Sequence, residues 1–319
     1  MNLTELLLID EKNYSYIMKT EIEPYLEKNR KDDFFFAEDN VKIHYEFYDK
    51  LLSRGTVVIL HGFTESAEKF REVSYYFYNE GYSVYAIALR DHGKSFRTSQ
   101  RPGTVETDDF HKYAEEISCL VEKEIKAQNE GKKIFIYSHS LGSTAALLYM
   151  LKNPMAVKKA EPSSPMKCRN LGMPVITAGT VAKVLSAIGG KKISAPGRCK
   201  FDPELSFQNS DATSSERFSY YHEKRKADSL LQTNGPSFGW VKASIEARDE
   251  ILSCADEINA ELLVIKPQED KQLLMEYTDK FIQKSKAKTK EIKNSKHEIF
   301  MSENETLSTY FEEIFSFLQ

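Results

Sequence analysis

Ser140 lies between an apolar, β-type stretch and a helix-forming stretch. Ile134–Tyr137 precedes it, the motif Ser-His-Ser-Leu-Gly surrounds it, and Thr144–Met150 follows. Small residues two positions before and after a serine let the strand and helix backbones approach closely in a sharp turn. The pattern predicts a nucleophile elbow, with a helix N-terminus behind the hydroxyl, and indicates a serine hydrolase. The plainer interpretation is a strand-to-helix junction with an incidental serine.

A nucleophilic serine needs a base that takes its proton and an acid that orients the base. In proteins with such an elbow the histidine comes last in the chain. Of the seven histidines, five precede or adjoin Ser140, and His222 lies in a segment of different composition. Only His297 remains, after a charged run and before a predicted closing helix over 302–318. We therefore predict that His297 is the base, against the alternative of a solvated loop histidine.

The acid is expected on the loop that follows the apolar run Leu262–Ile265. This loop has the sequence Lys-Pro-Gln-Glu-Asp, so Glu269 and Asp270 both qualify by chemistry. We prefer Asp270 because it lies farther out on the loop that faces the elbow, and Glu269 is the alternate. An ordinary surface carboxylate is the other interpretation.

The oxyanion formed during acyl transfer needs preorganised backbone N–H donors. One candidate is the amide of Leu141, directly after the nucleophile, where the helix dipole also points. The other is the amide of Phe63, on the loop that leaves Leu60. His61 is expected to support this loop instead of transferring protons.

Four continuous apolar runs, each bounded by turn signals, predict central strands. They are 57–60, 84–89, 134–137 and 262–265. Runs that are apolar on both faces are typical of parallel strands covered by helices on each side. Helical patterns over 68–80 and 110–128 alternate with them, which predicts an α/β fold with a doubly wound, mostly parallel sheet. Segments 33–36 and 41–48 predict an antiparallel hairpin at one edge.

The alternation of strands and helices stops between Met166 and about Phe238. This stretch is rich in Gly, Pro, Ser and Lys and holds one amphipathic piece that ends at Gly189. We expect an N-terminal arm over 1–32, a core over 33–166 and 239–319, and a lid or cap insertion over 167–238. An apolar stripe in the insertion is a candidate acyl channel or ordinary packing; its residues are Val175, Val181, Leu185 and Ile188.

The composition is that of a globular protein with a large core. The chain has 319 residues, 41% of them hydrophobic, and a net charge of −4, which gives no reason to expect nucleic acid as a partner. The N-terminus lacks signal-peptide features, no stretch approaches the length of a membrane span, and the four cysteines lack CxxC spacing. These features favour a cytoplasmic location.

One basic window departs from this average charge. Between Lys158 and Lys200 the only acidic residue is Glu161. The window is either a solvated face or a peripheral contact with an anionic membrane surface, such as the inner face of the membrane.

Several motifs occur in an order that resembles a known family. They are His61–Ser66, Gly81–Val84, Arg90–Ser95, Ser138–Gly142, Ser163–Met166 and Lys296–Ile299. Together they resemble the α/β-hydrolase superfamily and, within it, the bacterial lysophospholipase and monoacylglycerol lipase (serine aminopeptidase-like) family. The resemblance runs from about Phe34 to the C-terminus.

The resemblance implies an eight-stranded α/β-hydrolase sheet, a lid over an acyl pocket, and a triad of Ser140, Asp270 and His297. The implied reaction is hydrolysis of a carboxylic ester of a monoacyl lipid, lysophospholipid or monoacylglycerol, through an acyl-enzyme and without a metal or organic cofactor. An aminopeptidase or general carboxylesterase of the same fold, and a catalytically silent binding protein, are the alternatives.

Three positions depart from the family pattern. Ser138 and Asp91 stand where glycine is usual, and we expect small size or exposure to accommodate them. Gln268 occupies a position near the acid that is often glycine. This position bears on how the loop presents Asp270 or Glu269.

Overall fold

The structure is a computed structural model, and it describes residues 8–128, 131–163, 165, 175–196 and 201–319. Its centre is an eight-stranded sheet in the order β1-β2-β4-β3-β6-β7-β9-β10, and β5 and β8 form a separate two-stranded sheet. The strands are β1 (Arg30–Phe36), β2 (Lys42–Tyr48), β3 (Thr56–Leu60), β4 (Ser83–Ala88), β5 (Thr104–Val105), β6 (Ile134–His139), β7 (Lys159–Ser163), β8 (Gly235–Pro236), β9 (Glu261–Pro267) and β10 (Lys288–Ile292).

The six strands from β4 to β10 in the sheet are parallel, whereas β1 and β2 are antiparallel to their neighbours. Carboxyl ends of parallel strands meet at one edge, where ligands bind in open α/β sheets. Loops after β3, β6, β9 and β10 therefore converge on one region, and these loops carry Phe63, Ser140, Asp270 and His297.

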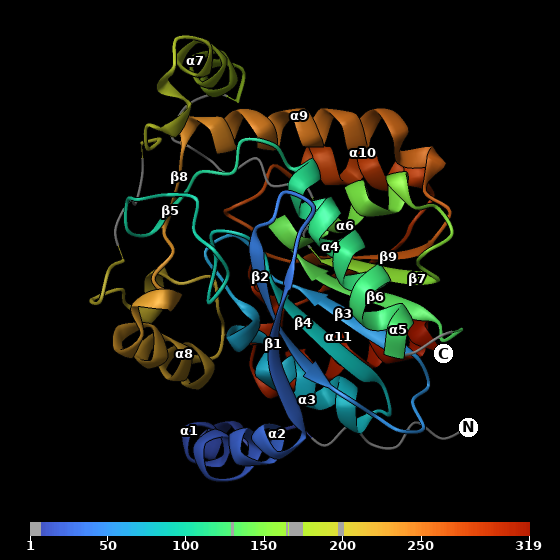
Figure 1. Cartoon of the computed structure of the whole chain (residues 1–319). Helices are drawn as coiled ribbons and strands as arrows, with labels where there is room; N and C mark the ends of the chain where they lie inside the picture. Colours follow the sequence, from blue (N-terminus) through green and yellow to red (C-terminus); the bar gives the residue numbers. More distant parts are fainter. Residues whose placement is uncertain (1–7, 129–130, 164, 166–174, 197–200) are drawn as a thin grey trace.

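Helices cover both faces of the sheet (Figure 1). The helices α4, α6, α9 and α10 lie on one face, and α3 and α11 lie on the other. The helix bounds are α1 (Tyr14–Ile17), α2 (Glu23–Asn29), α3 (Arg71–Asn79), α4 (His111–Leu120), α5 (Lys126–Gln128), α6 (Leu141–Lys152), α7 (Val175–Ala187), α8 (Ser215–Ala227), α9 (Phe238–Cys254), α10 (Met275–Ser285) and α11 (Asn304–Leu318).

Each face of the sheet has its own hydrophobic core. One contains Val58, Leu60 and Ile136 against α4, α6 and α9, and the other contains Val57 and Ile59 against α3 and α11. Successive residues of β3 thus enter different cores, because side chains alternate across a strand. This explains why the central strands are apolar at every position.

The predicted α/β fold, the edge hairpin and the four apolar strands are confirmed. The hairpin begins at Arg30, three residues before the predicted start, and Asn40 makes its turn with a φ of 63°. The strand β7 was not among the apolar runs, because Glu161 and Pro162 interrupt its sequence. Among the described residues, no helix is long and apolar enough to cross a membrane.

The segment comprising residues 175–196 and 201–238, which we call the cap segment, contains α7, α8 and β8. In Figure 1, α7 lies beyond α9, and α8 lies near the N-terminal helices α1 and α2. The helix α8 of the cap segment is attached to the core by Arg217, which is buried and whose guanidinium donates a hydrogen bond to Glu72 at 2.8 Å. The domain boundaries stay a prediction, and Lys167, Arg169, Arg198 and Lys200 of the basic window lie outside the described residues.

Candidate active site

Ser140 occupies the junction between β6 and α6 with φ 53° and ψ −110°. A non-glycine residue with this backbone conformation costs about 1–3 kcal/mol, and such strain is concentrated at functional sites. Two contacts hold the turn against β7: the Ser140 N–H donates to Ser163 O at 3.0 Å, and the Ser143 hydroxyl lies 2.9 Å from the same oxygen. The sharp turn that the motif predicts is therefore present.

The small residues on either side of Ser140 have distinct physical reasons. A Cβ atom at Gly142 would lie 2.3 Å from Leu60 O, so no larger residue fits there without moving β3. Ser138 is fully buried, and its hydroxyl donates to Glu161 O at 3.3 Å. Serine replaces the usual glycine at this position because it is small and its hydroxyl has an acceptor.

His297 and Asp270 lie in contact although 27 positions separate them. The Nδ1 atom of His297 lies 2.8 Å from Asp270 Oδ2, and both side chains are almost completely buried. Asp270 Oδ1 accepts the backbone N–H groups of Gln272 and Leu273 at 2.7 and 3.0 Å. Burial acts to raise the pKa of Asp270, but His297 and the two N–H donors hold it below its ordinary value.

Gln268 helps to hold the loop after β9, which carries Asp270, against the loop after β10, which carries His297. Its side-chain Oε1 accepts the N–H of Asn294 at 2.8 Å, and its own N–H donates to Ile292 O at 3.1 Å. Glu269 donates its N–H to Ser295 O, and its side chain is exposed. The structure therefore brings Asp270, and not Glu269, to the imidazole.

The other imidazole nitrogen, His297 Nε2, and the Ser140 hydroxyl are both buried, and neither has a hydrogen-bond partner in the described part of the chain. The ring of His139, directly before Ser140, lies 4.8 Å from the ring of His297. His297 and Ser140 thus lie at the same edge of the sheet, and neither Nε2 nor Oγ makes a hydrogen bond within the described residues. The hydrogen bond that His297 Nδ1–H donates to Asp270 fixes the tautomer in which Nε2 is the acceptor.

The loop after β3 is held from two sides. His61 Nδ1 lies 2.7 Å from Gly62 O, and its Nε2 accepts the N–H of Leu89 at 3.0 Å. Burial lowers the pKa of His61, which keeps the ring neutral and suited to this bridging role. His61 therefore supports the loop that carries Phe63, as expected, while Leu141 is the first residue of α6.

Lys69 links the loop after β3 to the loop that carries His297. None of the sequence motifs includes this lysine. Its buried ammonium lies 2.8 Å from Glu65 and 2.6 Å from Glu298, the residue after His297. Glu65 in turn accepts the N–H of Gly62 at 2.6 Å. Burial acts to raise the pKa of Glu65, but the charge of Lys69 keeps it below its ordinary value. The one sequence signal for part of this network is the four-residue spacing of Glu65 and Lys69, although Glu65 lies just before the short helix Ala67–Phe70.

A cavity of about 300 Å³ adjoins these loops. Its lining includes Thr64, Gln272 and Glu298, each within two residues of a candidate site residue. The cap segment supplies the opposite wall, which contains Phe201, Tyr221 and Arg225. The cavity thus lies between the candidate catalytic loops and the cap segment.

Three residues of the predicted acyl-channel stripe lie on α7, and the fourth, Ile188, directly follows the helix. Val181 and Ile188 expose 37% and 74% of their surface, and Leu185 is half-buried. The side chain of Val175 lies outside the described residues. A role of this stripe in holding the acyl chain stays a prediction.

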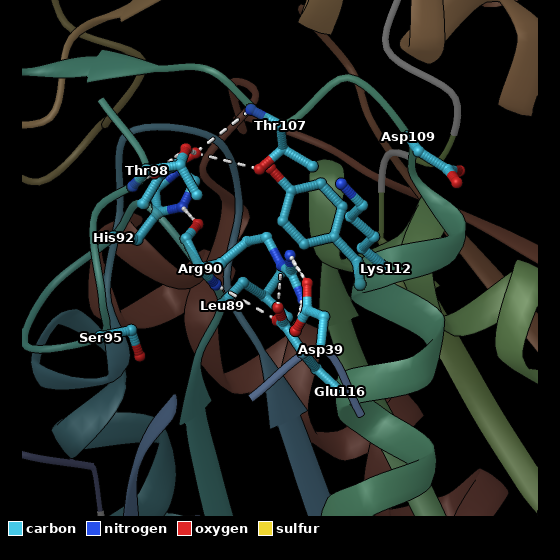
Figure 2. Close-up of polar contacts among 12 residues, drawn as sticks. Asp39, Leu89, Arg90, His92, Ser95, Thr98, Thr107, Asp109, Lys112 and Glu116 are labelled. Carbon is cyan, nitrogen blue, oxygen red and sulfur yellow. Dashed lines mark hydrogen bonds and ion pairs between the residues drawn. The ribbon is translucent and has the colours of Figure 1, made fainter. Parts of the chain in front are cut away.

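The structure contradicts the expectation for Asp91. We expected solvent exposure to accommodate an aspartate where glycine is usual, but Asp91 is fully buried and has a φ of 67°. Its carboxylate accepts hydrogen bonds from Thr98, Glu106 and Thr107. Figure 2 shows Thr98 and Thr107 in this region. The same view shows Arg90 paired with Asp39 and Glu116.

The sheet, its layers and the elbow define an α/β-hydrolase. Residues 52–305 match the family described as "Serine aminopeptidase, S33", and the chain belongs to this family. This confirms the resemblance inferred from the ordered motifs.

Similar proteins include two relatives and one solved structure. The chain is 21% identical to a probable lysophospholipase L2 of Haemophilus influenzae over 98% of this chain and 99% of the relative. It is 26% identical to a monoacylglycerol lipase of Mycolicibacterium smegmatis over 76% and 80% of the two chains. A soluble variant of monoglyceride lipase from Saccharomyces cerevisiae, in complex with a substrate analog, has the same fold, with a TM-score of 0.71, 17% identity and coverage of 91% and 94%.

Proposed function

We propose that this protein is a serine esterase that hydrolyses the carboxylic ester of a monoacyl lipid, a lysophospholipid or a monoacylglycerol. The observation that carries the proposal is the buried His297–Asp270 contact, together with the unengaged Nε2 and Ser140 Oγ atoms. The fold and the named relatives support a hydrolase of the esterase or lipase kind.

In the proposed mechanism, His297 Nε2 takes the proton from Ser140 Oγ as the oxygen attacks the ester carbonyl carbon. Asp270 stabilises the imidazolium that forms. The amides of Phe63 and Leu141 donate hydrogen bonds to the oxyanion, and the helix dipole of α6 favours the same charge. The imidazolium then protonates the departing alcohol. A water molecule, deprotonated by His297, attacks the acyl-enzyme and releases the fatty acid and free Ser140.

The cavity beside the catalytic loops supports a polar alcohol portion in the substrate. Its walls contain the charged side chains of Lys69, Arg225, Asp202, Asp211 and Glu298. A glycerol or phosphoglycerol group is rich in hydrogen-bonding atoms and matches such a lining better than a hydrocarbon chain does. We therefore assign the cavity to the leaving alcohol.

The exposed surface formed by the last turn of α7 and residues 188–193 after it supports delivery of the substrate from an anionic lipid surface. Val184, Ile188 and Ile193 expose 55%, 74% and 51% of their surface. Exposed lysines flank them, namely Lys183, Lys191 and Lys192. Apolar side chains that insert between lipids, with lysines that attract anionic head groups, are typical of interfacial helices. We call these six residues the α7 patch and propose that it contacts the membrane surface.

Cleavage of a peptide or aminoacyl amide is the second candidate, since the matching family carries the name of an aminopeptidase. The same triad chemistry serves both reactions. The two candidates differ in the leaving group that His297 must protonate, so they are separated by substrate and not by mechanism.

A substrate panel tests the proposal. Lysophosphatidylcholine, monoacylglycerols of graded length, p-nitrophenyl esters and aminoacyl amides are compared, with Ser140→Ala as the control. We expect ester hydrolysis and fluorophosphonate labelling by the wild type, and loss of both in a folded Ser140→Ala variant. Exclusive amide cleavage would favour the second candidate. Absence of labelling in the native protein would favour a silent binding protein, and turnover by Ser140→Ala would refute the nucleophile.

A further inference from the structure

We propose that Asp91 is a positioning residue that couples the cap segment to the loop carrying Phe63, an inference that rests on the proposed function. Asp91 lies immediately after Arg90 in the loop that leaves β4, and it is completely buried. Neither the triad nor the oxyanion donors include it.

The Asp91 carboxylate organises the chain from residue 98 to residue 107. Its Oδ1 accepts the N–H of Thr98 at 2.6 Å and lies 2.7 Å from the Thr98 hydroxyl. Its Oδ2 accepts the N–H groups of Glu106 and Thr107 at 3.1 and 3.2 Å, and the Thr107 hydroxyl at 3.0 Å. One side chain thus satisfies three backbone donors and two hydroxyls. This explains why a strained φ of 67° is occupied by aspartate.

The backbone of Asp91 reaches the cap segment directly. Its carbonyl oxygen accepts from Arg97 Nη1 at 2.7 Å and lies 3.4 Å from the Thr233 hydroxyl. Arg97 also donates to Leu230 O of the cap segment, at 2.5 Å. Residues 230–233 are therefore linked to Asp91 by two polar routes, one through Arg97 and one through the Thr233 hydroxyl.

The carboxylate reaches Phe63 through the short sheet and α9. Two of the three N–H groups held by Asp91 belong to Glu106 and Thr107, directly after β5, which pairs with β8. Val105 O accepts the N–H of Ser237, and the Ser237 hydroxyl caps the first turn of α9 by accepting the N–H of Trp240 at 3.1 Å. The indole of Trp240 packs on Phe63, with ring centroids 4.5 Å apart.

A second route passes through Tyr113. Trp240 Nε1 donates to the Tyr113 hydroxyl at 3.3 Å, and both residues are buried. Burial and, after it, the nearby charge of Asp91 raise the pKa of Tyr113, which is consistent with a position close to the carboxylate. His92, the neighbour of Asp91, also packs edge-on against Phe63 at 6.0 Å. Phe63 is thus supported by Trp240 and His92, and Asp91 fixes the elements that carry both.

A carboxylate is the specific requirement because every group around it can donate. The two hydroxyls can rotate, but the three backbone N–H groups cannot. In Asp91→Asn, one oxygen becomes an NH₂ group that faces at least one of these N–H donors in either amide orientation. The substitution keeps the size of the side chain and changes only its hydrogen-bonding character. Asp91→Gly removes the carboxylate but relieves the strained φ, so it separates positioning from folding.

Trp240 is the only tryptophan of the chain, so its fluorescence reports this contact. In Asp91→Gly we expect a red shift of the Trp240 emission, stronger acrylamide quenching, and a fall in kcat of about ten- to hundredfold with little change in KM. Asp91→Asn should change both signals in the same direction by a smaller factor. Asp109 is an exposed carboxylate on the following loop, between β5 and α4, and Asp109→Asn is the matched control that should leave both signals unchanged.

Three outcomes decide the proposal. Unchanged Trp240 emission, or a kcat within twofold of wild type in folded Asp91→Gly, would overturn it. A loss of activity that tracks only the unfolded fraction would overturn it as well. If Asp91→Gly does not fold, Thr107→Val takes its place in the test. This variant removes only the hydroxyl that donates to Asp91, and the proposal requires that it change both the Trp240 emission and kcat. Failure of the wild type to react with fluorophosphonate would refute the esterase function, whereas the fluorescence arm still tests the coupling of Asp91 to Phe63.

Discussion

Asp270 holds the imidazole of His297 through one oxygen, at 2.8 Å, while its other oxygen is occupied by two backbone N–H groups. The carboxylate is therefore held by the backbone of its own loop as well as by its contact with His297. This arrangement separates the role of Asp270 from that of exposed Glu269.

Asp270→Asn should lower kcat about 10³–10⁴-fold, because the amide no longer selects the tautomer with Nε2 as acceptor. Glu269→Gln is the control and should stay within twofold of wild type. Initial rates with a p-nitrophenyl ester give both values. A large loss in Glu269→Gln with little loss in Asp270→Asn would assign the acid to the other residue.

The same contact has a consequence for acid stability. The folded-state pKa of Asp270 is lowered, so this group stabilises the fold above its unfolded value near 3.8, and the stabilisation is lost as the pH falls through the folded pKa. Thermal unfolding of the wild type and Asp270→Asn should therefore differ most near neutral pH and converge in acid. Curves that stay parallel down to low pH would contradict this linkage.

Ser140→Gly should abolish turnover and stabilise the protein relative to Ser140→Ala by about 1–2 kcal/mol. Glycine adopts φ 53°, ψ −110° without the strain that a Cβ atom causes, whereas alanine keeps that strain. Urea unfolding of the two inactive variants compares them without interference from catalysis. Equal stability would show that the elbow is not strained.

Lys69→Met should destabilise the protein by about 3–5 kcal/mol, because it leaves the carboxylates of Glu65 and Glu298 without their shared cation in a buried place. Lys69→Arg keeps the charge and should recover most of the loss. Lys266→Met removes an ion pair with the largely exposed Asp279 and should cost less than about 1 kcal/mol. Comparable losses at positions 69 and 266 would contradict a special role of the buried network.

Glu161→Gln should become more stabilising as the pH rises. Glu161 is buried in β7, its carboxylate oxygens have no partner among the described residues, and burial raises its pKa well above 4.5. The unfolded chain releases this proton near pH 4.5 but the folded chain retains it, so wild-type stability falls above that pH by up to about 1.4 kcal/mol per unit. Melting temperatures from pH 4 to 8 measure the effect. A variant-to-wild-type difference independent of pH would show that Glu161 ionises normally.

Ile188→Ser should weaken binding to vesicles that contain phosphatidylglycerol by about tenfold, since the α7 patch loses its most exposed apolar side chain. Leu51→Ser is the matched control and should leave vesicle binding unchanged. Leu51 is 89% exposed on the loop before β3, at the other end of that strand from Phe63. Cosedimentation with vesicles measures binding, and comparison of low and high salt separates the electrostatic contribution of the lysines from the apolar contribution. Equal effects of the two variants would place the contact elsewhere.

The strands β3, β4, β6 and β9 could be predicted because each side chain along them enters one of two cores. The strand β7 could not, since Glu161 is polar but fully buried and Pro162 is unusual in a sheet centre. For the site, chain order and the strand-end loops were enough to indicate Ser140 and His297.

Other site features depend on distances that the sequence does not encode locally. Lys69 meets Glu298 across 229 positions, and Asp91 meets Thr107 only when its loop folds back. A glycine position occupied by aspartate signals a special backbone conformation. It does not reveal whether the side chain faces solvent, which is why exposure was the wrong expectation for Asp91.

The two outer strands of the large sheet, β1 and β10, are rich in charged residues, although the last three residues of β1 are phenylalanines. Arg30, Lys31, Asp32 and Asp33 occupy one, and Lys288, Lys290 and Glu291 occupy the other. An outer strand with free backbone groups is a template on which a second chain can extend the sheet, and dense charge discourages that event. Charge at both margins of the sheet thus disfavours end-to-end association of molecules through their outer strands.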